Sequence, residues 1–234
     1  MPPYLRPMAP TAPDAILCGD PARALTIAQE VLVEPRMSNH HRGLWSYHGE
    51  LPDGTELTVQ ATGIGGASAA IVLDALAARG LQRAIRVGTA RARGEGHALA
   101  ELVAPERVWA RDGASAAYGA VPGAALEPDP GLFSAIAGGC DGAGELVSLG
   151  RPLPVGREGA AEPGAAGLYD LQSAALLAAA REHGVAVGIG VVIVRNADGP
   201  LEDEPAEAAV LRLAGVAASA LAAGRTDGAT LNLK

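Results

Sequence analysis

Short apolar runs that alternate with helical segments constrain the fold of this chain more than any other feature. The runs at 14–18, 57–61 and 83–87 predict buried strands, and the segments at 22–33 and 68–79 predict helices between them. Strands that alternate with helices form a largely parallel sheet with helices on both faces. The sequence therefore predicts the α/β class, as a single three-layer αβα domain with a central mixed, largely parallel sheet.

Local signals mark the ends of these elements. Asp20 is a good N-cap for the first helix, and Pro21 suits its first position, where a backbone N–H would have no partner. Ser68 is a candidate cap for the second helix. Between the two helices, the Pro-Asp-Gly sequence at 52–54 predicts the turn of a hairpin over 44–59.

The remainder of the chain is less regular. The further predicted elements are strands at 103–110, 145–149 and 185–194 and helices at 132–137, 171–183 and 204–223. The segments 114–130 and 151–166 are predicted to be loops. We expect one domain over residues 1–234, with loose termini at 1–13 and 224–234.

Composition argues against several classes of protein. With 234 residues, 49% of them apolar, the chain can bury the core of one large domain. A net charge of -8 argues against a general nucleic-acid-binding surface, which would be basic. Cys18 and Cys140 are too few and too far apart for a metal motif or a disulfide framework.

The sequence also lacks targeting signals. The proline-rich segment 1–13 contains no apolar region typical of a signal peptide. No uninterrupted apolar stretch approaches the ~20 residues that span a bilayer. We therefore expect a cytoplasmic protein with no membrane partner.

Three segments carry groups suited to binding phosphate. Residues 19–23 (Gly-Asp-Pro-Ala-Arg) open the first helix, so backbone N–H groups, the helix dipole and Arg23 meet there. Arg86 is predicted at the end of the third strand, and its planar guanidinium suits two phosphate oxygens. Thr89 adds a hydroxyl in the loop expected after that strand, and Arg42 lies in an Asn-His-His-Arg-Gly segment. In α/β proteins such groups gather where loops leave the sheet.

Together with the Ala-Thr-Gly-Ile-Gly-Gly turn at 61–66, these segments resemble the nucleoside phosphorylase family, and most closely its uridine phosphorylase branch. The resemblance implies that phosphate is held by Gly19, Arg23, Arg86 and Thr89. It also implies that Arg42 reaches the site of a neighbouring subunit, so that a homodimer or homohexamer has shared active sites. The implied substrates are a nucleoside and inorganic phosphate, with no cofactor and no metal.

The resemblance resumes at 169–177 and 191–194, which correspond to the sugar and base site of the family. Uridine phosphorylases carry Glu-Met-Glu at this helix start, and the second Glu accepts hydrogen bonds from the ribose hydroxyls. Here the three positions are Asp170, Leu171 and Gln172. Gln172 can still accept through its carbonyl oxygen, but it lacks the negative charge that would favour an oxocarbenium ion.

Candidate roles follow from the resemblance. The candidate catalytic residues are Arg86, Asp170 and Gln172. The candidate contacts to the sugar and base are Thr89, Leu171, Gln172 and Asn196, the last because purine-specific relatives use an Asp near this position to protonate the base.

The base pocket departs most from the family pattern. After Thr89 the family usually continues with a small residue and Gly, whereas this chain continues Ala-Arg-Ala-Arg, which places Arg91 and Arg93 at or near the pocket. The segment that supplies base contacts is shortened, which leaves Arg151 and Arg157 as candidates by residue type alone.

These observations lead to one main functional hypothesis and two alternatives. The main hypothesis is a nucleoside phosphorylase, similar to uridine phosphorylase, with an altered base pocket. The first alternative is a nucleosidase that uses water in place of phosphate. The second is a catalytically weak protein that binds phosphate or a sugar phosphate, which the neutral Gln172 and the bulky Arg91 would favour.

Overall fold

The computed structural model describes residues 4–93, 96–152 and 167–229. Its strands are β1 (Asp14–Cys18), β2 (Val33–Asn39), β3 (Ser46–Glu50), β4 (Glu56–Ala61), β5 (Arg83–Ala92), β6 (Leu102–Arg111), β7 (Ala125–Leu126), β8 (Gly142–Leu149), β9 (Leu168–Asp170), β10 (Ala186–Asn196) and β11 (Gly199–Pro200). Its helices are α1 (Pro21–Val31), α2 (Gly65–Ala77), α3 (Gly113–Ala117), α4 (Pro130–Ala137), α5 (Ser173–His183) and α6 (Asp203–Ala229), with a 3-10 turn η1 (His41–Gly43).

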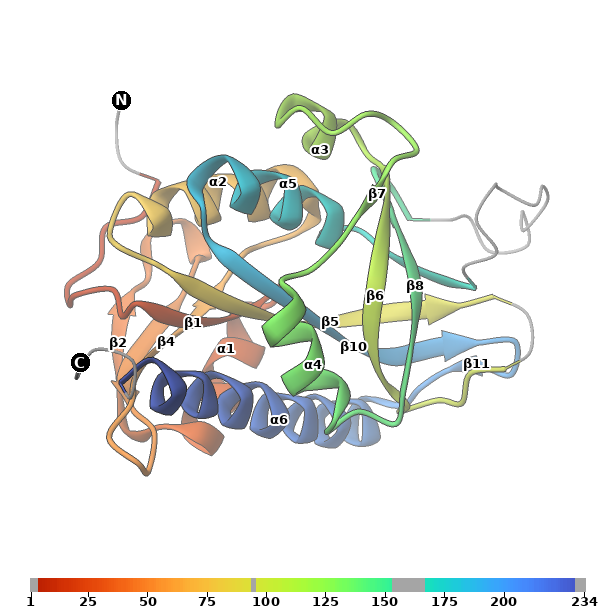
Figure 1. Cartoon of the computed structure of the whole chain (residues 1–234). Coiled ribbons are helices and arrows are strands. Elements are labelled where there is room, and N and C mark those ends of the chain that lie inside the picture. Colours follow the sequence, from red (N-terminus) through yellow and green to blue (C-terminus); the bar gives the residue numbers. More distant parts are fainter. Residues whose placement is uncertain (1–3, 94–95, 153–166, 230–234) are drawn as a thin grey trace.

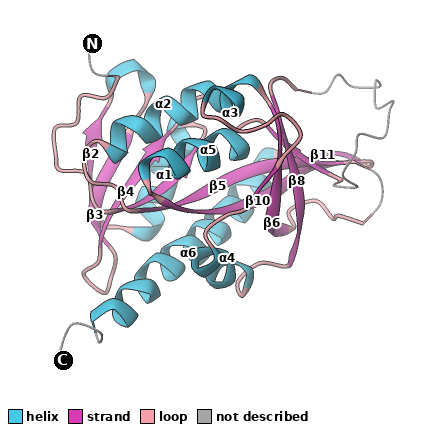
Figure 2. Ribbon diagram, turned by 45° about the horizontal axis from the view of Figure 1, so that its top comes forward, coloured by secondary structure: helices cyan, strands magenta, loops and turns pink. Residues whose placement is uncertain are grey.

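The elements form three layers around one sheet. Helices α2 and α5 lie on one face of the sheet, and α1, α4 and α6 lie on the other (Figures 1 and 2). This arrangement confirms the predicted α/β class and the three-layer architecture.

The middle of the sheet is parallel, and one side of it closes on itself. Strands β4, β1, β5 and β10 run parallel to one another, and β3 and β2 extend this part in antiparallel order. Strand β10 also pairs with β6, β6 with β8, β8 with β9, and β9 returns to β5. The long strands β5 and β10 therefore belong both to the open parallel sheet and to a closed ring of strands.

One edge of β5 changes its neighbour, and this change shapes the site. Strand β1 pairs with β5 as far as Arg86, and β9 pairs with β5 from Arg91 onward. The opposite edge of β5 stays paired with β10 from Arg83 to Arg91. The stretch between Arg86 and Arg91 therefore faces a gap between the C-terminal end of β1 and the C-terminal end of β9, which runs antiparallel to β5.

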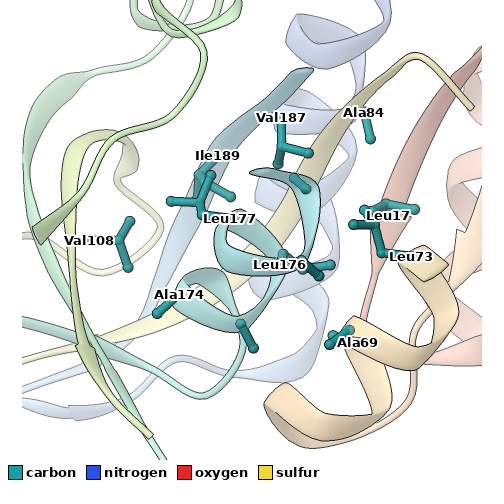
Figure 3. Packing of buried hydrophobic residues seen from close by; sticks show 14 of the residues in the cluster. Leu17, Ala69, Leu73, Ala84, Val108, Ala174, Leu176, Leu177, Val187 and Ile189 are labelled. Carbon is teal, nitrogen blue, oxygen red and sulfur yellow. The ribbon is translucent and has the colours of Figure 1, made fainter. Parts of the chain in front are cut away.

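Small aliphatic side chains form both halves of the core. Between the sheet and α2 and α5, Leu73 and Leu176 pack against Leu17 and Val187 (Figure 3). On the other face α6 approaches β10 closely at Gly190, where a Cβ would lie 2.7 Å from Leu213 Cδ1. A glycine inside this buried strand is thus explained by the close approach of a helix.

Many predicted elements are confirmed, with small shifts at their ends. Asp20 caps α1 by accepting a hydrogen bond from the backbone N–H of Arg23 at 3.0 Å, and Pro21 is its first residue. The hairpin β3–β4 is present, and α5 ends at Gly184 in the left-handed conformation. The loop predicted at 151–166 lies outside the described residues from 153 onward.

Other predictions were wrong. Strand β5 continues to Ala92 because its pairing with β10 continues, so Arg86 and Thr89 lie within a strand rather than at its end and in a loop. Helix α2 begins at Gly65, and the Ser68 hydroxyl donates to the Thr62 carbonyl in its first turn instead of capping it. The segment predicted as a loop at 114–130 contains most of α3, all of β7 and the first residue of α4.

The termini are more ordered than predicted. Leu5 and Ala12 are 1% exposed, and the backbone N–H of Ala12 donates to the Thr58 hydroxyl. At the other end, α6 runs to Ala229 instead of ending at residue 223. Helix α6 is also long and apolar enough to cross a membrane by length and composition. In this structure Leu213 is fully buried in the core between α6 and the sheet.

Candidate active site

A cavity of about 320 Å³ opens at the gap beside β5. The described residues that line it are Gly19, Asp20, Arg23, Gly63, Ile64, Gly65, Arg86, Gly88, Thr89, Ala90, Arg91, Leu149, Pro152, Tyr169, Asp170, Leu171, Gln172 and Val194. They come from the β1–α1 and β4–α2 turns, the segment before α5, and the ring strands β5, β8, β9 and β10. Ligands of open α/β sheets bind at such carboxyl ends of strands.

The β1–α1 turn forms the first wall of this cavity. Gly19 and Asp20 lead directly into α1, and the half-buried Arg23 lies in the first turn of this helix. Pro21 has no N–H and the Arg23 N–H is bonded to Asp20, so at this helix N-terminus the helix dipole and the Arg23 side chain favour an anion.

Arg86 forms the floor of the cavity and is held by three side chains. Its Nη2 lies 3.0 Å from Asp170 Oδ2, its Nη1 donates to Gln172 Oε1 at 2.7 Å, and its Nε donates to Ser173 Oγ at 3.1 Å. Arg86 is only 4% exposed, so these contacts compensate for burial of its charge. Three N–H groups are used, and one N–H on each Nη remains for a ligand.

Asp170 is the anchor of this cluster. Its carboxylate accepts hydrogen bonds from the Ser148 and Ser173 hydroxyls, from the Ser173 backbone N–H and from Arg86. It therefore caps the start of α5 and neutralises Arg86 in one contact network.

The Gln172 side chain is fully engaged inside the protein. Its Oε1 accepts from Arg86 and, at 3.2 Å, from the Thr62 hydroxyl. Its Nε2 donates to the carbonyl oxygens of Gly63 at 2.6 Å and Gly65 at 3.3 Å. Both glycines have positive φ angles, which suit glycine and orient this turn toward the amide. Gln172 thus ties the β4–α2 turn to Arg86, and its lone pairs and N–H groups already have partners.

Gly88 leaves the room that the Arg86 guanidinium occupies. The two residues lie on the same face of β5, and a Cβ on Gly88 would be 2.7 Å from Arg86 Cζ and Nη2. The absence of a side chain at 88 therefore lets Arg86 lie flat against its own strand and reach Asp170.

Replacing Gly88 with alanine is expected to displace the Arg86 guanidinium and destabilise the protein by about 1–3 kcal/mol, a typical cost of overpacking. Thermal unfolding of the variant checks this expectation. Gly144→Ala in β8 is the matched control, because Gly144 also lies in a strand and a Cβ there meets nothing within 4 Å. An unchanged melting temperature for Gly88→Ala would mean that the Arg86 guanidinium can move to another position at no cost in stability.

The structure brings together most, but not all, of the predicted site residues. Gly19, Arg23, Arg86 and Thr89 line one cavity with Leu171 and Gln172, and Asp170 lies beside Arg86. Asn196 is not among the described lining residues, because its side-chain amide donates to the His97 carbonyl and pairs with Asp198 in the turn after β10. Val194 lines the cavity instead.

Arg42 also lies away from the cavity of its own chain. It is exposed, and its guanidinium lies 5.8 Å from the centre of the Tyr4 ring. Its φ of 60° falls in the left-handed region, which is uncommon for a residue other than glycine. Arg42 is therefore exposed at η1, on a backbone conformation that is strained for an arginine.

Sequence reasoning missed several residues of the site. Ser148 and Thr62 support Asp170 and Gln172, and Tyr169 and Leu149 line the cavity. Of the base-pocket arginines, Arg91 lines the cavity, whereas Arg151 is not among its described lining residues. Arg157 lies outside the described residues.

Two further features concern the cysteine near this cavity and the possible metal ligands. Burial raises the pKa of the Cys18 thiol to about 12, so the thiol at the end of β1 is neutral. Within the described ranges, no group of three or more His, Cys, Asp or Glu side chains is placed to hold a metal ion.

The family model described as "Phosphorylase superfamily" matches residues 13–223, which include every described lining residue of the cavity. The chain belongs to the phosphorylase superfamily. This confirms the resemblance to the nucleoside phosphorylase family that the sequence motifs indicated.

Individual members of the superfamily match shorter segments. The chain is 45% identical over 74 residues to the uridine phosphorylase of Treponema pallidum, which is 32% of this chain and 28% of that protein. It is 40% identical over 75 residues to the DeoD-type purine nucleoside phosphorylase of Oceanobacillus iheyensis, which is 32% of either chain. The match thus spans about a third of the length of these curated relatives.

The fold is shared over a much larger part of the chain. The crystal structure of uridine phosphorylase from Vibrio fischeri covers 91% of this chain and 92% of its own, with a TM-score of 0.77 and 21% sequence identity. The superfamily fold is therefore present throughout, while sequence similarity to single relatives is local.

Proposed function

We propose that this protein is a nucleoside phosphorylase similar to uridine phosphorylase, with an altered base pocket. It would convert a nucleoside and inorganic phosphate into a free base and ribose or deoxyribose 1-phosphate, without a cofactor. The observation that carries this proposal is the convergence of the α1 N-terminus, Arg23 and the two unused N–H groups of Arg86 on one cavity.

In this mechanism positioning does most of the catalytic work. Phosphate held by Gly19, Arg23, Arg86 and Thr89 would lie beside C1′ of the sugar, and its oxygen would attack as the bond from C1′ to the base breaks. The bonding electrons leave with the base nitrogen, which takes up a proton through water, while the hydrogen phosphate gives up its own proton to water as it bonds to C1′, so that protons and charge balance. The phosphate dianion itself offsets the positive charge that develops on the sugar.

Leu171 contributes an apolar contact to the sugar in this proposal, and Asp170 and Gln172 act by holding Arg86. Both polar side chains already make internal hydrogen bonds. Their catalytic contribution would therefore be to fix the orientation of the guanidinium before phosphate binds.

The charges in one chain argue for a second subunit at each site. Arg23 and Arg86 are balanced by Asp20 and Asp170 among the charged side chains at the phosphate end of the cavity. A dianion would gain from an additional cation, and the exposed Arg42 of a neighbouring subunit is our candidate. A homodimer, alone or within a homohexamer, would provide it.

The assay of first choice measures release of free base from purine and pyrimidine nucleosides, each with and without phosphate. Phosphate-dependent release is expected. Equal release without phosphate would identify a hydrolase instead. No release from any nucleoside, by folded protein that binds phosphate, would favour a weak or inactive binding protein, an alternative supported by the neutral, fully bonded Gln172.

If active sites are shared between subunits, two variants that are each inactive alone should regain activity in mixed dimers. Mixed dimers of Arg42→Ala and Arg86→Gln would contain one site with both substitutions and one intact site. Random reassortment of equal amounts would then restore about a quarter of the original sites in a two-fold dimer. Activity is measured after co-expression of differently tagged chains, and each variant alone is the control. No recovery in purified mixed dimers would exclude the sharing of Arg42.

A further inference from the structure

Arg91 gives the cavity a positive charge that the phosphate site does not use. It is exposed, it lines the cavity, and its side chain has no hydrogen-bond or ion-pair partner among the described residues. Arg86, in contrast, is neutralised by Asp170. Arg91 lies five residues beyond Arg86 on β5, so their Cα atoms are roughly 16 Å apart along an extended strand. Arg91 therefore belongs to the end of the cavity far from α1.

A second arginine lies directly beside Arg91. Arg195 on β10 is the register partner of Arg91 on β5, next to a β-bulge in this ladder. Its side chain has no hydrogen-bond or ion-pair partner in the described part of the chain, and it lies behind Arg91 rather than among the described lining residues of the cavity. Like charges on adjacent strands repel and are destabilising. In a chain with a net charge of -8, carboxylates are plentiful, yet none of the described ones pairs with these two guanidinium groups. The pair is thus well suited to accept a negative charge from a ligand.

The neighbours of Arg91 define the shape of such a ligand. Ala90 precedes Arg91 on β5, Tyr169 is its register partner on β9, and Val194 lies beside it on β10; all three line the cavity, as does Leu149. Aliphatic and aromatic side chains of this kind pack against the faces of a flat ring, while a guanidinium recognises a carboxylate or a similar anion at its edge.

We infer that Arg91, with Arg195 beside it, selects substrates whose base carries a negative charge at the ring edge, such as a carboxylate. The inference rests on the proposed function, because it assigns this end of the cavity to the leaving base. A neutral base would leave the Arg91 guanidinium without a partner, and Arg91→Gln would remove the preference.

The test measures binding of free bases, which needs no catalysis. Calorimetric titrations, in the presence of inorganic phosphate, compare uracil with orotate and with 5-carboxyuracil, and hypoxanthine with urate. At least one anionic base is expected to bind about ten-fold or more tightly than its neutral counterpart, a difference of about 1.4 kcal/mol. The preference should weaken at high salt because Arg91 is exposed.

Matched variants separate this site from general charge effects. Arg91→Gln is expected to abolish the preference. Arg212→Gln, which removes an exposed arginine of α6 that pairs with Asp141, should keep it. Equal binding of neutral and anionic bases by the wild type, or a preference that survives Arg91→Gln, would overturn the inference.

Parallel cleavage assays keep this result distinct from the proposed function. Phosphate-dependent cleavage of uridine or inosine without any preference for anionic bases would leave the proposed function intact and overturn only the inference. A binding preference that depends on Arg91, in a protein that cleaves no nucleoside, would support the inference and contradict the phosphorylase.

Discussion

Replacing Arg86 with glutamine is expected to lower phosphate-dependent turnover by a factor of about 100 to 1,000, the usual cost of removing one preorganised charge-stabilising donor. The guanidinium has two N–H groups left for phosphate after it has bound Asp170, Gln172 and Ser173. Glutamine cannot bridge these partners and the ligand at once. Initial rates over a range of phosphate concentrations measure the loss.

Loss of activity alone would not distinguish a direct role from a collapsed site. Removing Arg86 leaves the buried carboxylate of Asp170 without its cation, and breaking such a pair costs about 3–5 kcal/mol. The double variant Arg86→Gln/Asp170→Asn removes both charges and should recover much of this stability. We expect it to stay inactive. If the double variant regained turnover, Arg86 would act only by balancing Asp170.

The secondary structure was largely predictable because it follows from local patterns. The run 14–18 followed by Asp20 and Pro21 specifies a strand, a turn and a capped helix within a few residues, and the structure contains all three. The phosphate-binding candidates near this turn lie on the cavity for the same reason. A strand that leads directly into a helix fixes the positions of the strand end, the turn and the helix N-terminus, and with them the residues that these carry.

The closed ring of strands was not predictable in the same way. Its closure depends on β9, a strand of three residues, and on β5 and β10 continuing past the end of β1. No local signal separates the part of β5 that pairs with β1 from the part that pairs with β9. The sequence therefore predicted a loop at Thr89, where the structure has a strand facing a gap.

The hydrogen bonds of Gln172 were hidden for a related reason. Its partners Thr62 and Gly63 are more than 100 residues away in the sequence, and only the fold brings them together. The sequence showed that Gln172 replaces a carboxylate of the family pattern. It could not show that the turn before α2 has adapted to the amide.

Restoring the family carboxylate through Gln172→Glu is therefore expected to harm this protein. The amide Nε2 donates to the carbonyl oxygens of Gly63 and Gly65, and a carboxylate would place an oxygen against them with no proton to share. Leaving such buried groups unsatisfied costs about 1–3 kcal/mol each. We expect a lower melting temperature and a lower rate of phosphate-dependent base release.

The control is Thr62→Val, which removes the hydroxyl that contacts Gln172 Oε1 and the Cys18 carbonyl oxygen but leaves the Gln172 amide N–H groups with their carbonyl partners. It should cost less than Gln172→Glu, since it introduces neither a charge nor a contact between two oxygens. Unfolding curves of both variants, with activity measured well below their melting temperatures, separate stability from catalysis. A stable Gln172→Glu variant with higher turnover would contradict this account. The β4–α2 turn would then accommodate either side chain, and the enzyme with the neutral Gln172 would be a less effective catalyst than one with a carboxylate at this position.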